Sequence, residues 1–176
     1  DQEMQLIKNS GGVVQIVGFS QYLRPLTQET QDKLNELRKR YDLPPLPNLA
    51  MALMPGDPII SAWSERKFGE YAGQLYAILE GEPKASLKDL GDAIDYTVRK
   101  IGIDHVGISS DFNEGGGVKG WENVGEIRNV TAELLSRGYT EADIAKLWGG
   151  NFLRVWDQVE KSAKPALATA QGAAKP

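Results

Sequence analysis

The fold of this chain is decided by the stretch Ile-Asp-His-Val-Gly-Ile-Ser-Ser-Asp-Phe at residues 103–112, which runs into Asn-Glu-Gly-Gly-Gly at 113–117. Its apolar centre predicts a short buried strand, and Asp111 follows that strand at its carboxyl end. In α/β enzymes, an acid in this position lies at the catalytic face of the sheet or barrel. The pattern therefore predicts an α/β fold with Asp111 as the candidate acid.

A helix followed by a strand is also predicted near the beginning of the sequence. Residues 3–9 have the character of a helix end, residues 10–12 read Ser-Gly-Gly, and the apolar run at 13–19 is rich in β-branched residues. This order is typical of one half of a (β/α) barrel repeat. The strands at about 13–17 and 106–109 are therefore expected to be parallel and adjacent.

The helix before the second strand has a recognisable start and end. Ser86 and Asp89 have the spacing of a capping box, apolar residues recur at helical spacing up to Ile101, and Gly102 is expected to stop the helix. A few linking residues then lead into the strand, as in a (β/α) repeat. A right-handed crossover requires this helix, at about 87–101, to pack on the outside of the two strands.

Three motifs occur in the same order as in a known enzyme family. They are Ser-Asp-Phe-Asn at 110–113, Gly-Tyr-Thr-Glu at 138–141 and Gly-Gly-Asn-Phe-Leu-Arg-Val at 149–155. Together they resemble the renal (membrane) dipeptidase family of zinc metallopeptidases, and Gly-Gly-Val-Val at 11–14 is similar to that family's penultimate strand. The resemblance implies that residues 1–164 are the C-terminal part of a (β/α)8 TIM-like barrel, with its last two strands and flanking helices.

The resemblance also implies a role for Asp111. The corresponding aspartate of the family lies over the metal pair and contacts the amino end of the substrate. Asp111 is therefore expected to be both catalytic and substrate-binding, and to help manage the proton during peptide cleavage. Many members have a second aspartate where this chain has Asn113. Without the resemblance, Asp111 has a simpler explanation, since aspartate at a strand end commonly caps N–H groups of the following turn.

The zinc ligands of the family have no counterpart in this sequence. The resemblance implies two zinc ions held by a His-x-Asp pair, a bridging glutamate and two further histidines, all before the portion that this chain resembles. The sequence has no cysteine and one histidine, His105, whereas zinc needs at least three protein ligands. His105 is therefore expected to be packed or hydrogen-bonded, and no residue of this chain is predicted to bind metal.

Two classes of function follow. The first is a fragment of a metal-dependent dipeptidase, inactive alone, that needs the N-terminal part of the barrel as its partner and a dipeptide as its substrate. The sequence starts with aspartate and not methionine, and an isolated half barrel would expose strand edges, so we expect a longer parent protein. The alternative is a non-catalytic half barrel, a binding or assembly module that has lost the metal site.

Residues 21–83 do not align with the motifs and are predicted to be an insertion in a βα loop. Helices are expected at about 28–41 and 64–80, with a proline-rich crossing at 43–47 between them. Long βα loops build the substrate pocket of a barrel. Apolar residues at 50–54 and 59–60 are therefore expected to line that pocket or to contact a second subunit.

The C-terminal part is predicted to be helical up to a disordered tail. Helices are expected at about 121–136 and 140–162, the second broken near Gly149 and Gly150. From 165 to 176 the composition is dominated by Ala, Gly, Thr, Gln and Pro, which predicts disorder. Four apolar residues at helical spacing predict a core stripe: Trp148, Phe152, Trp156 and Val159.

Composition excludes some other classes of protein. The 176 residues, 41% hydrophobic and 25% charged, are typical of one globular domain. A net charge of −4 argues against a nucleic-acid partner. The absence of cysteine excludes a disulfide framework and a thiolate zinc site, but the compartment, whether bacterial cytoplasm, periplasm or outside the cell, stays open, as does homo-oligomerisation.

Overall fold

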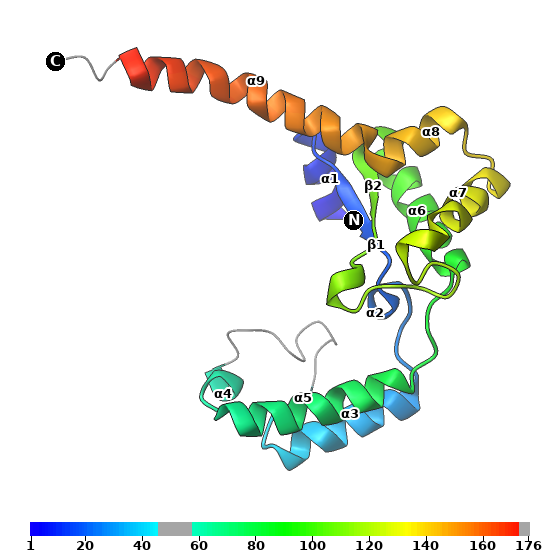
Figure 1. Cartoon of the computed structure of the whole chain (residues 1–176), viewed down its shortest axis with the longest axis vertical. Coiled ribbons are helices and arrows are strands. Elements are labelled where there is room, and N and C mark those ends of the chain that lie inside the picture. Colours follow the sequence, from blue (N-terminus) through cyan, green and yellow to red (C-terminus); the bar gives the residue numbers. More distant parts are fainter. Residues whose placement is uncertain (46–57, 173–176) are drawn as a thin grey trace. The chain divides into compact units, whose positions relative to one another are not determined.

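A computed structural model describes residues 1–45 and 58–172, which belong to two units (Figure 1). The strand unit comprises Asp1–Leu23 and the chain from Ala85 onward, and the hairpin unit comprises Arg24–Lys84. The hairpin unit covers almost the same residues as the insertion expected at 21–83, although its identity as a βα-loop insertion stays a prediction. None of the described helices combines the length and apolar character needed to cross a membrane.

The strand unit is built on two parallel strands, β1 (Val14–Val17) and β2 (Val106–Ser109). Val14 pairs with Val106 and Val17 with Ser109. Helix α6 (Leu87–Ile101) contacts both strands. The predicted parallel pair and its connecting helix are therefore confirmed, and the described chain is a mostly helical α/β structure. A partial barrel is not itself visible in these two strands and stays a prediction.

Helix α6 begins and ends where the sequence indicates. Ser86 Oγ accepts a hydrogen bond from Asp89 N, and the Asp89 carboxylate accepts one from Ser86 N, which completes the capping box. Gly102 follows the helix with a φ of 87°, a left-handed conformation that favours glycine. Helix α1 (Gln2–Asn9) packs against α6, and α2 (Ser20–Leu23) follows β1. The apolar face of α6 lies in the core of the strand unit: Leu90, Ile94 and Ile101.

The helices after β2 differ from the prediction at their boundaries. The helix expected at 121–136 is α7 (Ile127–Ser136), preceded by the 3-10 turns η3 (Phe112–Glu114) and η4 (Val124–Glu126). Trp121 is buried in the core, and Asn123 caps η4 by accepting from Gly125 N, so the chain cannot start a regular helix there. Helix α8 (Glu141–Ala145), the π turn η5 (Lys146–Gly150) and α9 (Asn151–Gly172) complete the unit.

The predicted core stripe on the last helix is wrong for three of its four residues. Trp148 packs against the core, but Phe152, Trp156 and Val159 are 46%, 58% and 62% exposed. The reason is a kink at Gly149, whose φ of 168° and ψ of −19° are not helical, so Trp148 and the three residues after the kink do not lie on one helical face. Asn151 is the residue that α9 buries instead.

The C-terminal tail also differs from its prediction as far as it is described. Helix α9 continues to Gly172, although disorder was predicted from residue 165. Alanine has the highest helix propensity of all residues, so an alanine-rich segment with no core-forming pattern still favours a helix. Residues 173–176 lie outside the described part of the chain.

The hairpin unit consists of α3 (Gln28–Arg40), α4 (Pro58–Ser61) and α5 (Glu65–Glu80). The predicted helices at 28–41 and 64–80 are thus confirmed, and α3 packs against α5. At the open end, Thr27 donates from its N and Oγ1 to the Glu82 carboxylate, both at 2.8 Å. The unit has its own small core: Leu34, Leu37, Leu43, Ile60, Tyr71 and Leu75.

Part of the predicted pocket lining falls in this unit. Ile60 is 8% exposed and belongs to the core of the hairpin unit, whereas Ile59 is 43% exposed. The apolar run at 50–54 and the end of the proline-rich crossing, at 46–47, lie outside the described residues. Ile60 therefore stabilises its own unit, because α4 packs this side chain inward.

Candidate active site

The loops that follow β1 and β2 are joined at the carboxyl edge of the sheet. Gly18 N donates to Ser109 O at 2.8 Å, and Gly117 N donates to Gly18 O at 2.6 Å. Ser20 Oγ donates to Gly117 O at 3.4 Å and accepts from Ala85 N at 3.1 Å. The residues after both strands therefore share one face of the strand unit, as a pair of parallel strands requires.

Asp111 lies at this edge, and its backbone is held by the loop that follows it. Its carbonyl accepts a hydrogen bond from Gly116 N at 2.8 Å. A Cβ atom at Gly116 would lie 2.3 Å from Ser110 O, so only glycine permits this close approach. On the next residue, the Phe112 ring packs edge-on against Trp121 with centroids 5.3 Å apart. The loop is thus tied to the core directly beside the acid.

The backbone of Asp111 is strained, and its carboxylate is unpaired. Its φ of 58° and ψ of 28° place it in the left-handed region, which costs a non-glycine residue about 1 kcal/mol or more. The side chain is partly exposed and caps no N–H group of the turn that follows. Among the described residues, the Asp111 carboxylate has no hydrogen bond or ion pair. The loop-cap explanation therefore has no contact to support it here.

His105 makes a hydrogen bond that links two segments of the fold. Its Nδ1 donates to the Gly12 carbonyl at 2.8 Å and so links the segment before β2 to the segment before β1. This fits the expectation of a hydrogen-bonded histidine. Across residues 1–45 and 58–172, no three His, Asp or Glu side chains come together in a way that could hold a metal ion.

Asn151 binds the amino edge of the sheet from the start of α9. It is 3% exposed, and its Nδ2 donates to Ile103 O at 2.7 Å and to Val106 O at 2.8 Å. Asn151 therefore ties down the backbone at the start of β2. The carbonyls that it binds, however, lie more than 40 residues earlier in the chain, at the start of β2.

Arg154, one turn further along α9, binds two more carbonyls at the same edge. Its Nη1 donates to Gly11 O at 3.0 Å and its Nη2 to Asp104 O at 2.7 Å. Asp104 also pairs with Lys146 at 2.7 Å, and the hydrogen bond from Lys146 lowers the pKa of the Asp104 carboxyl below its usual range. The role of Arg154 was not predicted from the sequence, although the Gly-Asn-Phe-Leu-Arg motif contains it.

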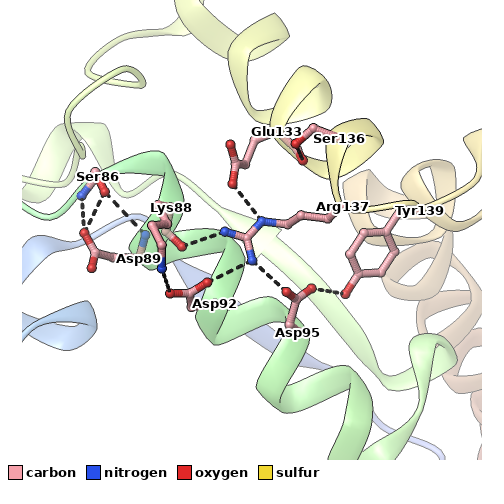
Figure 2. Close-up of polar contacts among 9 residues, drawn as sticks. All are labelled: Ser86, Lys88, Asp89, Asp92, Asp95, Glu133, Ser136, Arg137 and Tyr139. Carbon is pink, nitrogen blue, oxygen red and sulfur yellow. Dashed lines mark hydrogen bonds and ion pairs between the residues drawn. The ribbon is translucent and has the colours of Figure 1, made fainter.

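The Gly-Tyr-Thr-Glu motif at 138–141 belongs to a polar cluster between α6 and α7 (Figure 2). Arg137 pairs with Asp92 at 2.9 Å, with Asp95 at 2.6 Å and with Glu133 at 2.7 Å. Tyr139 Oη donates to Asp95 at 2.8 Å, and burial, together with that hydrogen bond, raises the pKa of Tyr139. The cluster joins two helices and a turn, so its charges have structural partners.

The segment at 137–141 also accounts for the residue types at Thr140 and Gly91. Thr140 begins α8 through a second capping box with Asp143. At Gly91 on α6, a Cβ atom would lie 2.3 Å from Arg137 Nε, so any side chain there would displace the guanidinium. The motif therefore positions helices and does not contribute to the candidate site.

The family model described as membrane dipeptidase (peptidase family M19) matches residues 1–170. The chain belongs to this family. A solved structure, that of the probable dipeptidase PvdM from Pseudomonas aeruginosa, is 72% identical to the chain and superimposes with a TM-score of 0.81. That match covers 91% of this chain and 40% of the PvdM chain.

Curated dipeptidases from fungi are similar over a shorter stretch. Dipeptidase aclJ of Aspergillus oryzae is 40% identical over 95 residues, which cover 53% of this chain and 22% of aclJ. Dipeptidase ataJ of Aspergillus terreus is 44% identical over 73 residues, which cover 41% of this chain and 18% of ataJ. The matched part of the chain thus spans about a fifth of the length of these dipeptidases.

Two of the three motifs lie at opposite edges of the strand pair. Ser-Asp-Phe-Asn lies at the carboxyl edge of the sheet, whereas the Asn151 and Arg154 motif lies at the amino edge. In barrel enzymes the carboxyl edge holds the chemistry and the opposite edge contributes to stability. Of these motifs, the one that contains Asp111 lies at the carboxyl edge.

Proposed function

We propose that this chain contributes the last two strands, with their flanking helices, to a (β/α)8 barrel of a zinc-dependent dipeptidase. Asp111 is its catalytic and substrate-binding acid. Family membership, the parallel strand pair and the likeness to PvdM support the proposal. The observation that carries it is the unpaired Asp111 carboxylate at the carboxyl edge, on a residue whose carbonyl is held by Gly116 N.

The chemistry of Asp111 follows from its charge and its position. A dipeptide carries an ammonium group at its amino end, and an unpaired carboxylate attracts that group and accepts its hydrogen bonds. The same carboxylate is able to take or return a proton at the amine released by peptide cleavage. A positioned acid or base of this kind contributes about two to four orders of magnitude in rate.

The described residues do not fit a zinc site. No cluster of three metal-binding side chains exists among them, and His105 is engaged by a backbone carbonyl. The proposal therefore assigns both zinc ions to residues outside this chain, and no step is derived through them. The contribution argued for this chain is the binding of the substrate ammonium and the handling of its proton.

The hairpin unit is proposed to be an insertion in the loop between β1 and α6. Its residues leave the strand unit after Leu23 and return at Ala85, and it has a core of its own. A segment that packs internally can be inserted between a strand and a helix without breaking the repeat. The remaining residues after 164 are proposed to lie outside the barrel.

A non-catalytic module is the second candidate function. The absence of a metal-binding cluster from the described residues favours it, since a half barrel that binds or assembles needs no zinc. The two candidates differ in one measurable property. The dipeptidase needs zinc held elsewhere in a longer protein, whereas the module has no such site in any context.

The test compares the 176-residue chain with a longer protein that contains it. The chain alone is expected to hydrolyse no dipeptide and to bind zinc no more tightly than about micromolar, because carboxylates without imidazoles make a weak zinc site. The longer protein is expected to bind zinc and to cleave a simple dipeptide. Chelator-sensitive turnover by the 176-residue chain would contradict the assignment of zinc, and a longer protein without zinc or turnover would favour the module.

A further inference from the structure

An aromatic pair lies beside the loop that carries Asp111. The Phe19 backbone forms a parallel bridge with Gly117, and a Cβ atom built on Gly115 would lie 3.8 Å from Phe19 Cε2. The Tyr22 ring meets the Phe19 ring edge-on, with centroids 4.9 Å apart. The ring of Phe19 therefore borders the glycine segment that begins four residues after the acid, and Tyr22 extends this apolar surface.

The core of the strand unit does not account for this pair. Leu23, from the same short helix α2, packs against that core, but Phe19 and Tyr22 do not. Tyr22 is 63% exposed, and Phe19 is partly exposed. Large aromatic side chains outside the core, at the edge that holds an unpaired acid, are typical of a binding site.

The geometry of a dipeptide explains what such a surface would contact. The ammonium and the side chain of its amino-terminal residue are attached to the same carbon atom, so a group that binds the ammonium has the side chain close by. Of the three glycines at 115–117, Gly115 is the one that faces Phe19, whose ring is the only group of the described chain, apart from adjacent residues, within 4 Å of a Cβ atom built there.

We propose that Phe19 and Tyr22 form the wall of a subsite for the side chain of the substrate's amino-terminal residue, and that they select apolar over acidic side chains there. The inference rests on the proposed function, because it assumes that Asp111 binds the substrate ammonium. It adds a specificity that the acid cannot supply, since every dipeptide carries the same ammonium.

The test measures kcat/KM for Leu-Gly, Asp-Gly and Gly-Gly with the zinc-loaded protein that contains this chain. The variants are Tyr22→Ala and Phe19→Leu, the second of which keeps an apolar side chain at position 19. Loss of an apolar wall is expected to lower kcat/KM for Leu-Gly about tenfold in Tyr22→Ala, with Gly-Gly within about twofold of wild type. The kcat/KM of Phe19→Leu for Leu-Gly is expected to lie between the values of wild type and Tyr22→Ala.

A matched control is Tyr76→Ala, since Tyr76 is similarly exposed, at 57%, but lies on α5 of the hairpin unit. It should leave the Leu-Gly to Asp-Gly ratio unchanged. If wild type cleaves dipeptides, two results for Tyr22→Ala count against the subsite: an unchanged Leu-Gly to Asp-Gly ratio, or a kcat/KM that is lowered equally for all three substrates. Either result overturns the subsite and leaves the proposed function standing. If wild type cleaves none of them, the proposed function fails and the inference fails with it.

Discussion

The two edges of the strand pair differ in how their polar groups are hydrogen-bonded. At the amino edge, the side chains of Asn151 and Arg154 bind four backbone carbonyls. At the carboxyl edge, the Asp111 carboxylate has no partner among the described residues, and its backbone is left-handed. Hydrogen bonds concentrated at one edge stabilise the pair, so the other edge can hold a strained, unpaired acid.

This comparison predicts opposite outcomes for substitutions at the two edges. A change at the carboxyl edge should reduce activity and leave stability intact. A change at the amino edge should reduce stability, because its side chains hydrogen-bond backbone carbonyls of the same fold. Four substitutions or conditions, from the largest expected effect to the smallest, test this division.

The largest effect is expected for Asp111→Asn in the zinc-loaded protein that contains this chain. Asparagine keeps the size of the side chain but removes the charge that pairs with the substrate ammonium and carries the proton. The kcat should fall by about two to four orders of magnitude, with melting temperature and zinc content unchanged. Normal turnover with a lowered melting point would retire the catalytic assignment.

The next effect is expected for Asn151→Ala at the amino edge. The substitution leaves the Ile103 and Val106 carbonyls without their donor in a buried site, which should cost about 2–3 kcal/mol in the free energy of unfolding. Urea unfolding of the 176-residue chain measures it. Asn129→Ala is the control, because that exposed side chain makes a single hydrogen bond, to Gly120 O, and should cost about 1 kcal/mol or less.

A smaller loss of stability is expected for Arg154→Lys. Lysine keeps the positive charge but lacks the planar fork that reaches the Gly11 and Asp104 carbonyls at once. The free energy of unfolding should fall by about 1–2 kcal/mol, since one of the two hydrogen bonds is lost. An unchanged urea midpoint would show that the fork does not stabilise this edge.

The smallest effect concerns the Asp104–Lys146 ion pair. Because Lys146 lowers the pKa of Asp104 in the folded state, the pair stabilises the protein above the ordinary aspartate pKa and loses that contribution as pH falls below about 4. Asp104 is 60% exposed, so solvent screening limits the gain to a few tenths of a kcal/mol. Lys146→Met should therefore be slightly less stable than wild type at pH 7 and equal to it near pH 2. A difference that persists at pH 2 would have another cause.

Local signals predicted much of this fold. The capping box of Ser86 with Asp89 and the stop at Gly102 are interactions among near neighbours, so the start and end of α6 could be predicted from the sequence. The β-branched runs predicted both strands, and a helix with a short link to the second strand implied their parallel order. The position of Asp111 at the carboxyl edge follows from that order alone.

The side that α9 presents to the core could not be predicted in this way. The break near Gly149 was predicted, and the structure has a kink there, but Phe152 and Trp156 after the kink are exposed. The direction that a helix takes after a kink depends on how it packs against other segments, which a local pattern does not encode. The contacts of Arg154 with Gly11 and of Phe19 with Gly117 were missed for a similar reason, since they join distant segments of the chain.

The sequence by itself determined the order of the elements, the parallel strand pair and the acid that follows its second strand, because these depend on local propensity and on the chirality of the crossover. Only the tertiary structure decided that the Asp111 carboxylate is unpaired while Asn151 and Arg154 bind the opposite edge. Those contacts join residues far apart in the chain, and their geometry is set by packing, which no local pattern encodes.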